Sequence, residues 1–152
     1  MAKTTTVMNG AQLKDYAAKF ATDLERKIFL STAYAHSATG AEGTRELKKA
    51  LSERHGASPK SKDYATAPIG DPPYMHTGML RNSIGFVIVG NEKRMYMKVG
   101  SGPGVSPVEY AKPLDHGLHP FLYIAEYYAN AENWIKHWQE KFRSMKTTEP
   151  KE

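Results

Sequence analysis

A short turn rich in histidine is the first group of residues that could do chemistry. Asp115, His116 and His119 lie close together in the sequence, and a His-x-x-His pair with a nearby carboxylate can supply ligands to zinc. Gly117 interrupts any helix that would place both imidazoles on one face. His119 is followed by Pro120, a pattern typical of a turn that leads into a helix. We therefore interpret the segment as a turn and predict no metal site.

Other catalytic motifs are equally incomplete. Residues 100–104 read Gly-Ser-Gly-Pro-Gly, which is similar to a phosphate-binding loop, but the Lys-Ser/Thr ending of such loops is missing. Three carboxylates, Glu109, Asp115 and Glu126, are near one another in sequence, yet nothing predicts the paired geometry that acid–base catalysis needs. The chain has no cysteine, which excludes disulfides and thiolate metal sites. We predict no catalytic residues, no cofactor and no enzymatic activity.

Composition and charge favour a single soluble domain. A chain of 152 residues is long enough to bury a core. The net charge is +5, and its densest basic stretch, residues 45–62, is interrupted by acidic residues, which is typical of a solvated helix face. No apolar run approaches the roughly 20 residues of a membrane helix, and the first residues lack the apolar core of a signal peptide. We therefore expect a soluble protein of the cytoplasm.

The N-terminal part predicts two helices. Apolar residues recur every three or four positions from Ala11, which indicates a long amphipathic helix that ends near His36. Residues 37–40, Ser-Ala-Thr-Gly, are expected to break it, and a second short helix is predicted from Thr44 to Leu51. The positions expected to face the core are Leu13, Ala17, Phe20, Leu24, Ile28 and Ser31.

The middle of the chain predicts a β-hairpin. Residues 83–89 and 94–99 are rich in β-branched and aromatic residues and flank a Gly-Asn turn. In the second strand Met95, Met97 and Val99 alternate with polar residues, so one face should be buried. Because two strands alone are marginal in water, they must pack on helices or continue a sheet across a subunit boundary.

The C-terminal part predicts two more helices. Ser106 followed by Pro107 predicts a helix start, and Gly117 is expected to close that short helix. A final helix is predicted from Phe121 with a core-facing ridge, and Tyr127 and Trp134 lie off this ridge, so we expect them to touch a neighbouring subunit. The ridge consists of Phe121, Ile124, Tyr128, Ala131, Ile135, Trp138 and Phe142.

Together these elements predict an α+β fold in one domain over residues 11–145. Long N- and C-terminal helices are expected to pack on the small antiparallel hairpin at 83–99. Residues 57–74 hold four prolines and should form an extended arm; connections this long are usually functional or disordered, so we expect the arm to dock on another subunit. Residues 1–10 are expected to be flexible and residues 146–152 disordered.

A series of short motifs in the C-terminal half resembles one protein family, the head–tail joining proteins of long-tailed bacteriophages (neck, tail-completion or minor tail components). That family has a Pro-rich arm, a Thr-Gly-x-Leu-Arg-x-Ser-Ile stretch, two strands, a Val-Gly-small run, Tyr-Ala, an acidic-x-Gly turn and Pro-Phe. This chain has Asp115 where the family usually has Glu, and a longer glycine-rich run at 100–104. The matching residues, taken as family-motif and subunit-interface candidates, are Pro72, Pro73, Thr77, Gly78, Leu80, Arg81, Ser83, Gly100, Tyr110, Ala111, Asp115, Gly117, Pro120 and Phe121.

The resemblance implies a structural virion protein. It implies a homo-oligomeric ring, most plausibly a hexamer, in the phage neck between the head portal and the tail. Its partners would be further copies of itself, the connector on the portal side and the tail-tube proteins, with DNA passing through the lumen without sequence recognition. No membrane partner is implied.

Two alternatives stay open. A tail terminator or minor tail subunit would share the location and much of the logic. A DNA-binding accessory protein, of another class, would use the basic face at residues 45–62. Phosphate contacts would make DNA binding fall steeply with salt, whereas a ring held by apolar burial would barely respond.

Overall fold

The computed structural model describes most of the chain. The described residues are 10–53, 67–73, 78–91, 93–102, 106–117 and 119–146. The predictions for the extreme N-terminus, for the tail, for Thr77 and for arm residues 57–66 and 74 concern positions outside this part.

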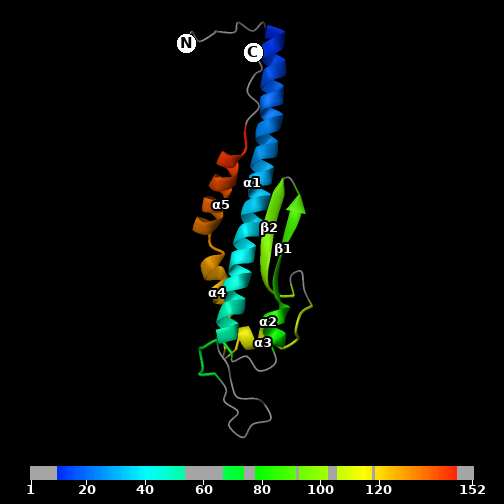
Figure 1. The fold of residues 1–152 in the computed structure, drawn as a ribbon. Coiled ribbons are helices and arrows are strands. Elements are labelled where there is room, and N and C mark those ends of the chain that lie inside the picture. The colour runs from blue at the N-terminus through cyan, green and yellow to red at the C-terminus, as the bar shows by residue number, and fades with distance from the viewer. Residues whose placement is uncertain are drawn as a thin grey trace, which may run out of the picture.

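The predicted α+β class is confirmed. One long helix runs the length of the molecule, and a two-stranded antiparallel hairpin and shorter helices lie along it (Figure 1). The elements are α1 (Gly10–Glu53), α2 (Met79–Ser83), β1 (Ile84–Asn91), β2 (Arg94–Ser101), α3 (Ala111–Asp115), α4 (Leu122–Tyr128) and α5 (Ala131–Ser144).

The prediction that residues 37–40 end the first helix and that a second helix follows is wrong. α1 is a single helix of 44 residues that runs through both regions. Gly40 and Gly43 are instead the points where other elements contact the backbone of α1. A Cβ on Gly40 would lie 2.5 Å from atoms of Met97 and Phe86 in the hairpin, and one on Gly43 would lie 3.1 Å from Ala125 and Ala129. Glycine weakens an isolated helix by about 1 kcal/mol relative to alanine, but here the missing side chain lets the hairpin and α4 approach the α1 backbone.

The predicted hairpin is confirmed, with the register Phe86↔Val99 and Ile88↔Met97. Asn91 shapes its turn, since its Oδ1 accepts hydrogen bonds from the backbone N–H groups of Lys93 and Arg94 at 3.0 and 3.1 Å. The expected alternation also holds. The odd residues of β2 are half-buried and the even residues from Arg94 to Lys98 are exposed.

The helix predicted from Ser106 begins later, at Ala111. One contact and the position of Pro113 explain the shift. The backbone N–H of Val108 donates to Ser101 Oγ at 3.4 Å, which holds this stretch against β2. Starting at Ala111 also places Pro113 in the first helical turn, where its missing N–H costs no hydrogen bond.

The prediction of one continuous last helix is also wrong, because this region divides into α4 and α5, and Asn130 caps the start of α5. The Asn130 side chain accepts a hydrogen bond from the backbone N–H of Asn133 at 2.9 Å and so caps α5. Its amide group also donates to Tyr127 O at 2.7 Å. The Asn-Ala-Glu sequence at 130–132 was a readable N-cap signal. The predicted ridge is covered unevenly: Ile135 is 48% exposed, Trp138 and Phe142 are half-buried, and no residue of α5 is fully buried.

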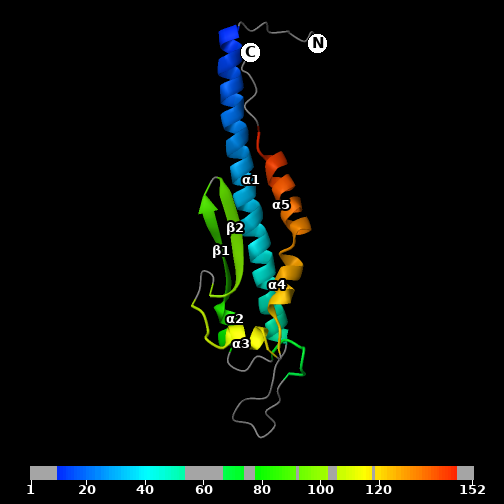
Figure 2. The same cartoon turned by 180° about the vertical axis from the view of Figure 1, so that it is seen from behind.

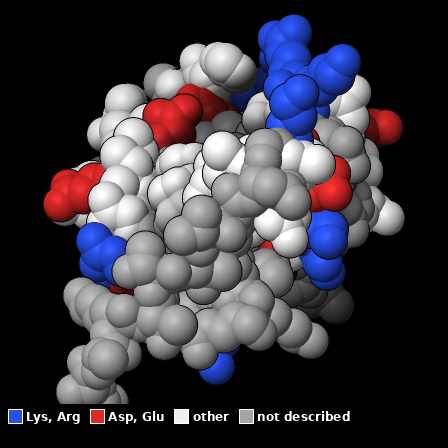
Figure 3. Space-filling model, turned by 90° about the horizontal axis from the view of Figure 1, so that it is seen from above, with Lys and Arg blue, Asp and Glu red and all other residues white. Residues whose placement is uncertain are grey.

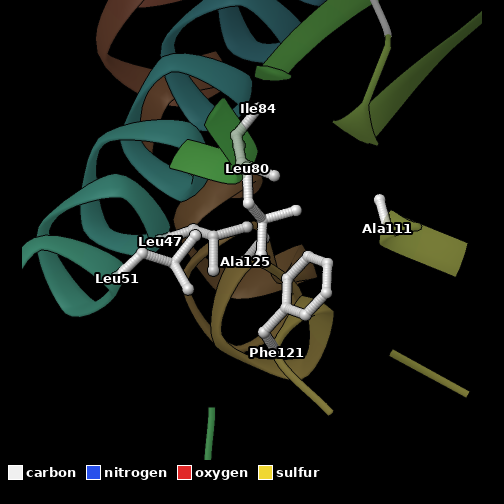
Figure 4. Close-up of a cluster of buried hydrophobic side chains, with 7 residues drawn as sticks. All are labelled: Leu47, Leu51, Leu80, Ile84, Ala111, Phe121 and Ala125. Carbon is white, nitrogen blue, oxygen red and sulfur yellow. The ribbon is translucent and has the colours of Figure 1, made fainter. Parts of the chain in front are cut away.

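The core lies at the C-terminal end of α1. Figure 4 shows its side chains converging from α1, α2, the start of β1, α3, α4 and Phe121. Phe121, Leu47 and Ile84 have no exposed surface. The cluster consists of Leu47, Leu51, Leu80, Ile84, Ala111, Phe121 and Ala125.

No described element covers the other end of α1 in this way. It extends past α5 and the hairpin in both views (Figures 1 and 2). Leu13 is 57% exposed and Phe20 41% exposed. The prediction that this apolar face enters the core is therefore wrong for residues 11–30, of which none is buried. It is right for Ser31, which is fully buried.

Candidate functional site

Most of the family-motif residues meet at one end of the molecule and form its core junction. Leu80 and Phe121 are buried in the core cluster. Gly78 is buried with a φ of 74°, a left-handed backbone that favours glycine, and it precedes the first residue of α2. Pro72 is fully buried and Pro73 is half-buried. The buried members of the motif help to hold this junction together, and the subunit-interface role of the motif residues stays a prediction.

Ser83 joins the hairpin ends to α2. Its Oγ donates to Leu80 O at 2.7 Å and lies 2.8 Å from the hydroxyl of Ser101 at the end of β2. The Gly102 N–H donates to Ser83 O at 2.9 Å. Gly100 is buried beside these residues, with a φ of 153° that a side chain would strain. The motif serine and glycine therefore lock the base of the hairpin.

Asp115 ties α3 to the start of α4. Its Oδ1 accepts hydrogen bonds from the backbone N–H groups of Phe121 and Leu122, each at 2.8 Å. This satisfies amides that a helix start leaves without partners. Gly117 allows the chain to turn here, because a Cβ would lie 2.7 Å from the carbonyl oxygen of Pro113. The acidic-x-Gly motif thus has a structural role.

The histidines that suggested a metal site have other surroundings. His119 Nδ1 donates to the carbonyl oxygen of Asp71 at 3.1 Å and ties the end of the Pro-rich arm to the body. His116 is exposed. In the part of the chain that the structure describes, no three His, Cys, Asp or Glu side chains are grouped to hold a metal ion.

Arg81 lies at the edge of the junction. Its Nη1 donates to Ser52 Oγ at 3.4 Å, and its Nε and Nη2 donate to Asn82 Oδ1 at 3.3 Å. These contacts link α2 to the last turn of α1. Among the motif positions, Arg81 is half-buried, Pro120 is half-buried and Tyr110 is 44% exposed.

The two aromatic interface candidates, Tyr127 on α4 and Trp134 on α5, differ in their exposure. Tyr127 is 71% exposed and its ring meets Tyr128 edge-on at 5.1 Å. Trp134 is half-buried and lies 5.6 Å from the ring of His36 on α1. Trp134 therefore packs against α1, and the expectation that Tyr127 and Trp134 contact a neighbouring subunit stays a prediction.

His36 stands where α1, α5 and the hairpin meet. Burial lowers the pKa of His36 below its ordinary value near 6.5, and a hydrogen bond with the backbone of Met95 opposes this shift. Nearby, Trp138 Nε1 donates to Thr32 Oγ1 at 3.2 Å. Lys27 Nζ lies 4.3 Å from the ring centre of Phe142. Polar and aromatic contacts, rather than deep burial, attach α5 to α1.

The basic stretch predicted to be a solvated helix face fits that interpretation where it is described. Arg45 lies 2.9 Å from Glu46, and Lys49 lies 4.0 Å from Glu53. Residues 54–62 of the stretch lie outside the described part. Figure 3 shows a different part of the surface, seen from the N-terminal end of α1, where several Lys and Arg side chains gather at one edge and other charged side chains of both signs are scattered.

Two surfaces escaped the sequence analysis. One is the apolar stripe of α1, here defined as Leu13, Ala17, Phe20, Leu24 and Ile28, whose members are exposed or half-buried. The other is a cleft between α1 and the turn of the hairpin. The periodicity of the stripe was visible in the sequence, but the sequence alone did not show that no described element covers it.

Comparisons with protein-family models, with curated proteins and with solved structures found no match to this chain. Within the described residues, no helix is long and apolar enough to cross a membrane.

Proposed function

We propose that this protein is a structural subunit of the neck of a long-tailed phage. Copies would form a ring that joins the portal side of the head to the tail and lets DNA pass. The order of the motifs from Pro72 to Phe121 suggests this family. A tail terminator or minor tail subunit is a variant of this proposal, in which the ring lies at a neighbouring position along the axis of the neck and tail.

The observation that supports assembly is that two unlike surfaces have no cover from the described residues. The first is the apolar stripe of α1. The second is the outer edge of β1, which lies on the side of the hairpin away from α4 and pairs with no other described strand (Figures 1 and 2). A closed ring needs two different patches on each subunit, because its contacts are head-to-tail.

The β1 edge lacks the features that normally protect a free strand. Its sequence, IGFVIVGN, has no charged residue and no proline over eight residues. The Gly102–Ser83 hydrogen bond and the register place the N–H and C=O groups of Phe86 and Ile88 on the outer side, whereas the N–H of Ile84 donates to Arg81 O. Such an edge is a template for another strand, which a neighbouring subunit could supply.

The roles of the motif residues also support a structural protein. Ser83, Asp115 and Phe121 hold the junction through buried contacts and backbone hydrogen bonds. The DNA-binding alternative finds less support, since the described basic residues of stretch 45–53 include two that lie beside carboxylates.

Electron microscopy of purified virions, or of a portal–neck assembly that carries this protein, tests the proposal. We expect ring density for this fold between portal and tail after averaging about the tail axis. Absence of the protein from the particle would overturn the proposal and favour the DNA-binding alternative.

Two substitutions in the apolar stripe test whether this surface contacts another subunit. Leu13→Ser combined with Phe20→Ser should leave the thermal unfolding of the isolated chain unchanged, because both side chains are already exposed. We expect incorporation into particles to fall at least tenfold. Lys112→Ser, at an exposed position of α3, is the matched control and should incorporate normally. Normal incorporation of the double variant would exclude the stripe as a subunit contact.

A further inference from the structure

A cleft of about 670 Å3 lies between α1 and the turn of the hairpin. We call it the hairpin cleft. Its α1 wall includes Thr22, Arg26, Phe29 and Thr32, which are spaced by three or four residues and so share one face of the helix. At 1.5 Å per residue this wall is about 15 Å long, or nearly three helical turns.

The floor of the hairpin cleft is apolar. Ile28, Phe29 and Met95 line it, and Ile28 is 43% exposed while the other two are half-buried. Ile28 also belongs to the apolar stripe, so the cleft continues an uncovered apolar surface. A partner that covered this floor would gain roughly 25 cal/mol for each Å2 of apolar surface removed from water.

The rim of the hairpin cleft is cationic. Arg26, Lys93 and Arg94 line it, all three are exposed, and Glu25 is the one carboxylate among the described residues of the lining. Within the described residues, none of the three cations lies in a salt bridge. Elsewhere on the same helix, by contrast, Arg45 lies 2.9 Å from Glu46. Three unpaired cations around an apolar floor favour a ligand that is both acidic and apolar.

Other occupants match this surface less well. Nucleic acid would satisfy the cations but leave the floor uncovered, and Glu25 would repel its phosphates. A second copy of this chain would need an acidic amphipathic face. Its described helices carry mixed charges instead: α5, for example, presents Glu132 and Glu140 together with Lys136, Lys141 and Arg143.

We propose that the hairpin cleft binds an acidic amphipathic helix of a partner protein. The apolar side of that helix would cover Ile28, Phe29 and Met95, and its carboxylates would face Arg26, Lys93 and Arg94. This is the helix-in-groove mode of recognition, with anchors repeating at three and four residues. The proposal concerns the single chain and stands independently of the neck role.

The test uses the full chain and a dye-labelled 18-residue helical peptide with leucines at three- and four-residue spacing and glutamates on both flanks. A matched peptide carries glutamine in place of each glutamate. Fluorescence anisotropy should show that the acidic peptide binds at least tenfold more tightly than the glutamine peptide at low salt. Amide NMR shifts should map to residues 22–32 and 93–95.

Protein variants locate the contact. Arg26→Gln combined with Arg94→Gln should weaken binding of the acidic peptide about three- to tenfold, since each exposed ion pair contributes modestly. Ile28→Ser should weaken both peptides. The matched control, Lys112→Gln with Lys136→Gln, removes two exposed charges elsewhere and should leave affinity unchanged.

Three results would overturn the proposal. One is equal affinity for the two peptides, or NMR shifts that lie outside the cleft. The second is tighter binding of a 20-base-pair DNA duplex than of the acidic peptide at physiological salt, with loss in the Arg26→Gln, Arg94→Gln variant. The third is self-association of the wild type in sedimentation that the same variant abolishes, which would make a second copy the occupant.

Discussion

Residues 10–30 and 31–53 belong to one helix, but only the second half buries side chains. The first half carries large apolar residues such as Leu13 and Phe20 at helical spacing, and they remain exposed. The second half buries Ser31, Ala35, Thr39, Gly40 and Gly43, which are small. Small residues let the hairpin and α4 approach closely, and beyond them Leu47 and Leu51 enter the core cluster. The packed half therefore differs from the exposed half because other described elements lie across from it, and not because of the size or apolar character of its own side chains.

The difference also assigns roles to the halves. Leu47 and Leu51 at the end of α1 anchor the core junction together with Phe121. The first half contributes to one wall of the hairpin cleft and carries the apolar stripe. Stability should therefore depend on the second half, and interactions with partners on the first.

The sharpest test removes a leucine from each half. Leu47→Ala should lower the free energy of unfolding by about 2–5 kcal/mol, because Leu47 is fully buried and the change leaves a cavity. Leu13→Ala, the same change at a 57% exposed site, should alter it by less than about 0.5 kcal/mol. Urea unfolding followed by circular dichroism measures both. Equal losses would contradict the contrast between the halves.

A second pair adds bulk instead of removing it. Gly40→Leu should destabilise the fold by about 1–3 kcal/mol, because even its Cβ would lie 2.5 Å from Met97 and Phe86 atoms. Ala21→Leu, on the exposed half, should have little effect. Thermal unfolding compares the two. A Gly40→Leu protein as stable as the wild type would show that the hairpin does not need close approach to α1.

A third pair compares two aspartates. Asp115→Ala should cost about 1–2 kcal/mol, because the amides of Phe121 and Leu122 lose their shared acceptor. Asp15→Ala, at an exposed position in the first half of α1, should stay within about 0.5 kcal/mol. Hydrogen exchange of the Phe121 and Leu122 amides gives a direct readout, and unchanged protection in Asp115→Ala would exclude the capping role.

The smallest effect concerns pH. His36, in the second half, has a folded pKa below its ordinary value because burial disfavours the charged ring. As pH falls below about 6.5, the unfolded chain binds the proton first, so stability decreases toward acid and is fully present above that pH. His36→Gln should flatten the dependence of the unfolding free energy between pH 7 and 5. His116→Gln, at an exposed site, should keep the wild-type slope.

Much of the fold could be read from local patterns. The hairpin followed from two β-rich segments around a Gly-Asn turn, and the alternation in β2 identified its buried face. Phe121 at the start of the last helical region was placed correctly in the core. These signals are local, because strand alternation and turn chemistry depend on neighbours in the sequence.

The errors arose where a distant contact changed the meaning of a local signal. Gly40 was interpreted as a helix breaker, but Met97 and Phe86 use the space it leaves. Ser106 was interpreted as a cap, but Ser101 binds the N–H of Val108. Asn130 is a residue type typical of N-caps and does cap α5, but the apolar periodicity on both sides of it led to the prediction of one continuous helix.

The sequence by itself determined the α+β class, the hairpin and the absence of cysteine chemistry, since composition, periodicity and turn residues are properties of short segments. Only the tertiary structure decided which periodic faces are covered. Burial depends on what lies across from a residue, and elements far apart in the chain supply that: the second half of α1 meets the hairpin, α4 and α5, whereas the stripe around Phe20 lies beyond them. For the same reason Asp115, which looked like a metal ligand, proved to cap α4.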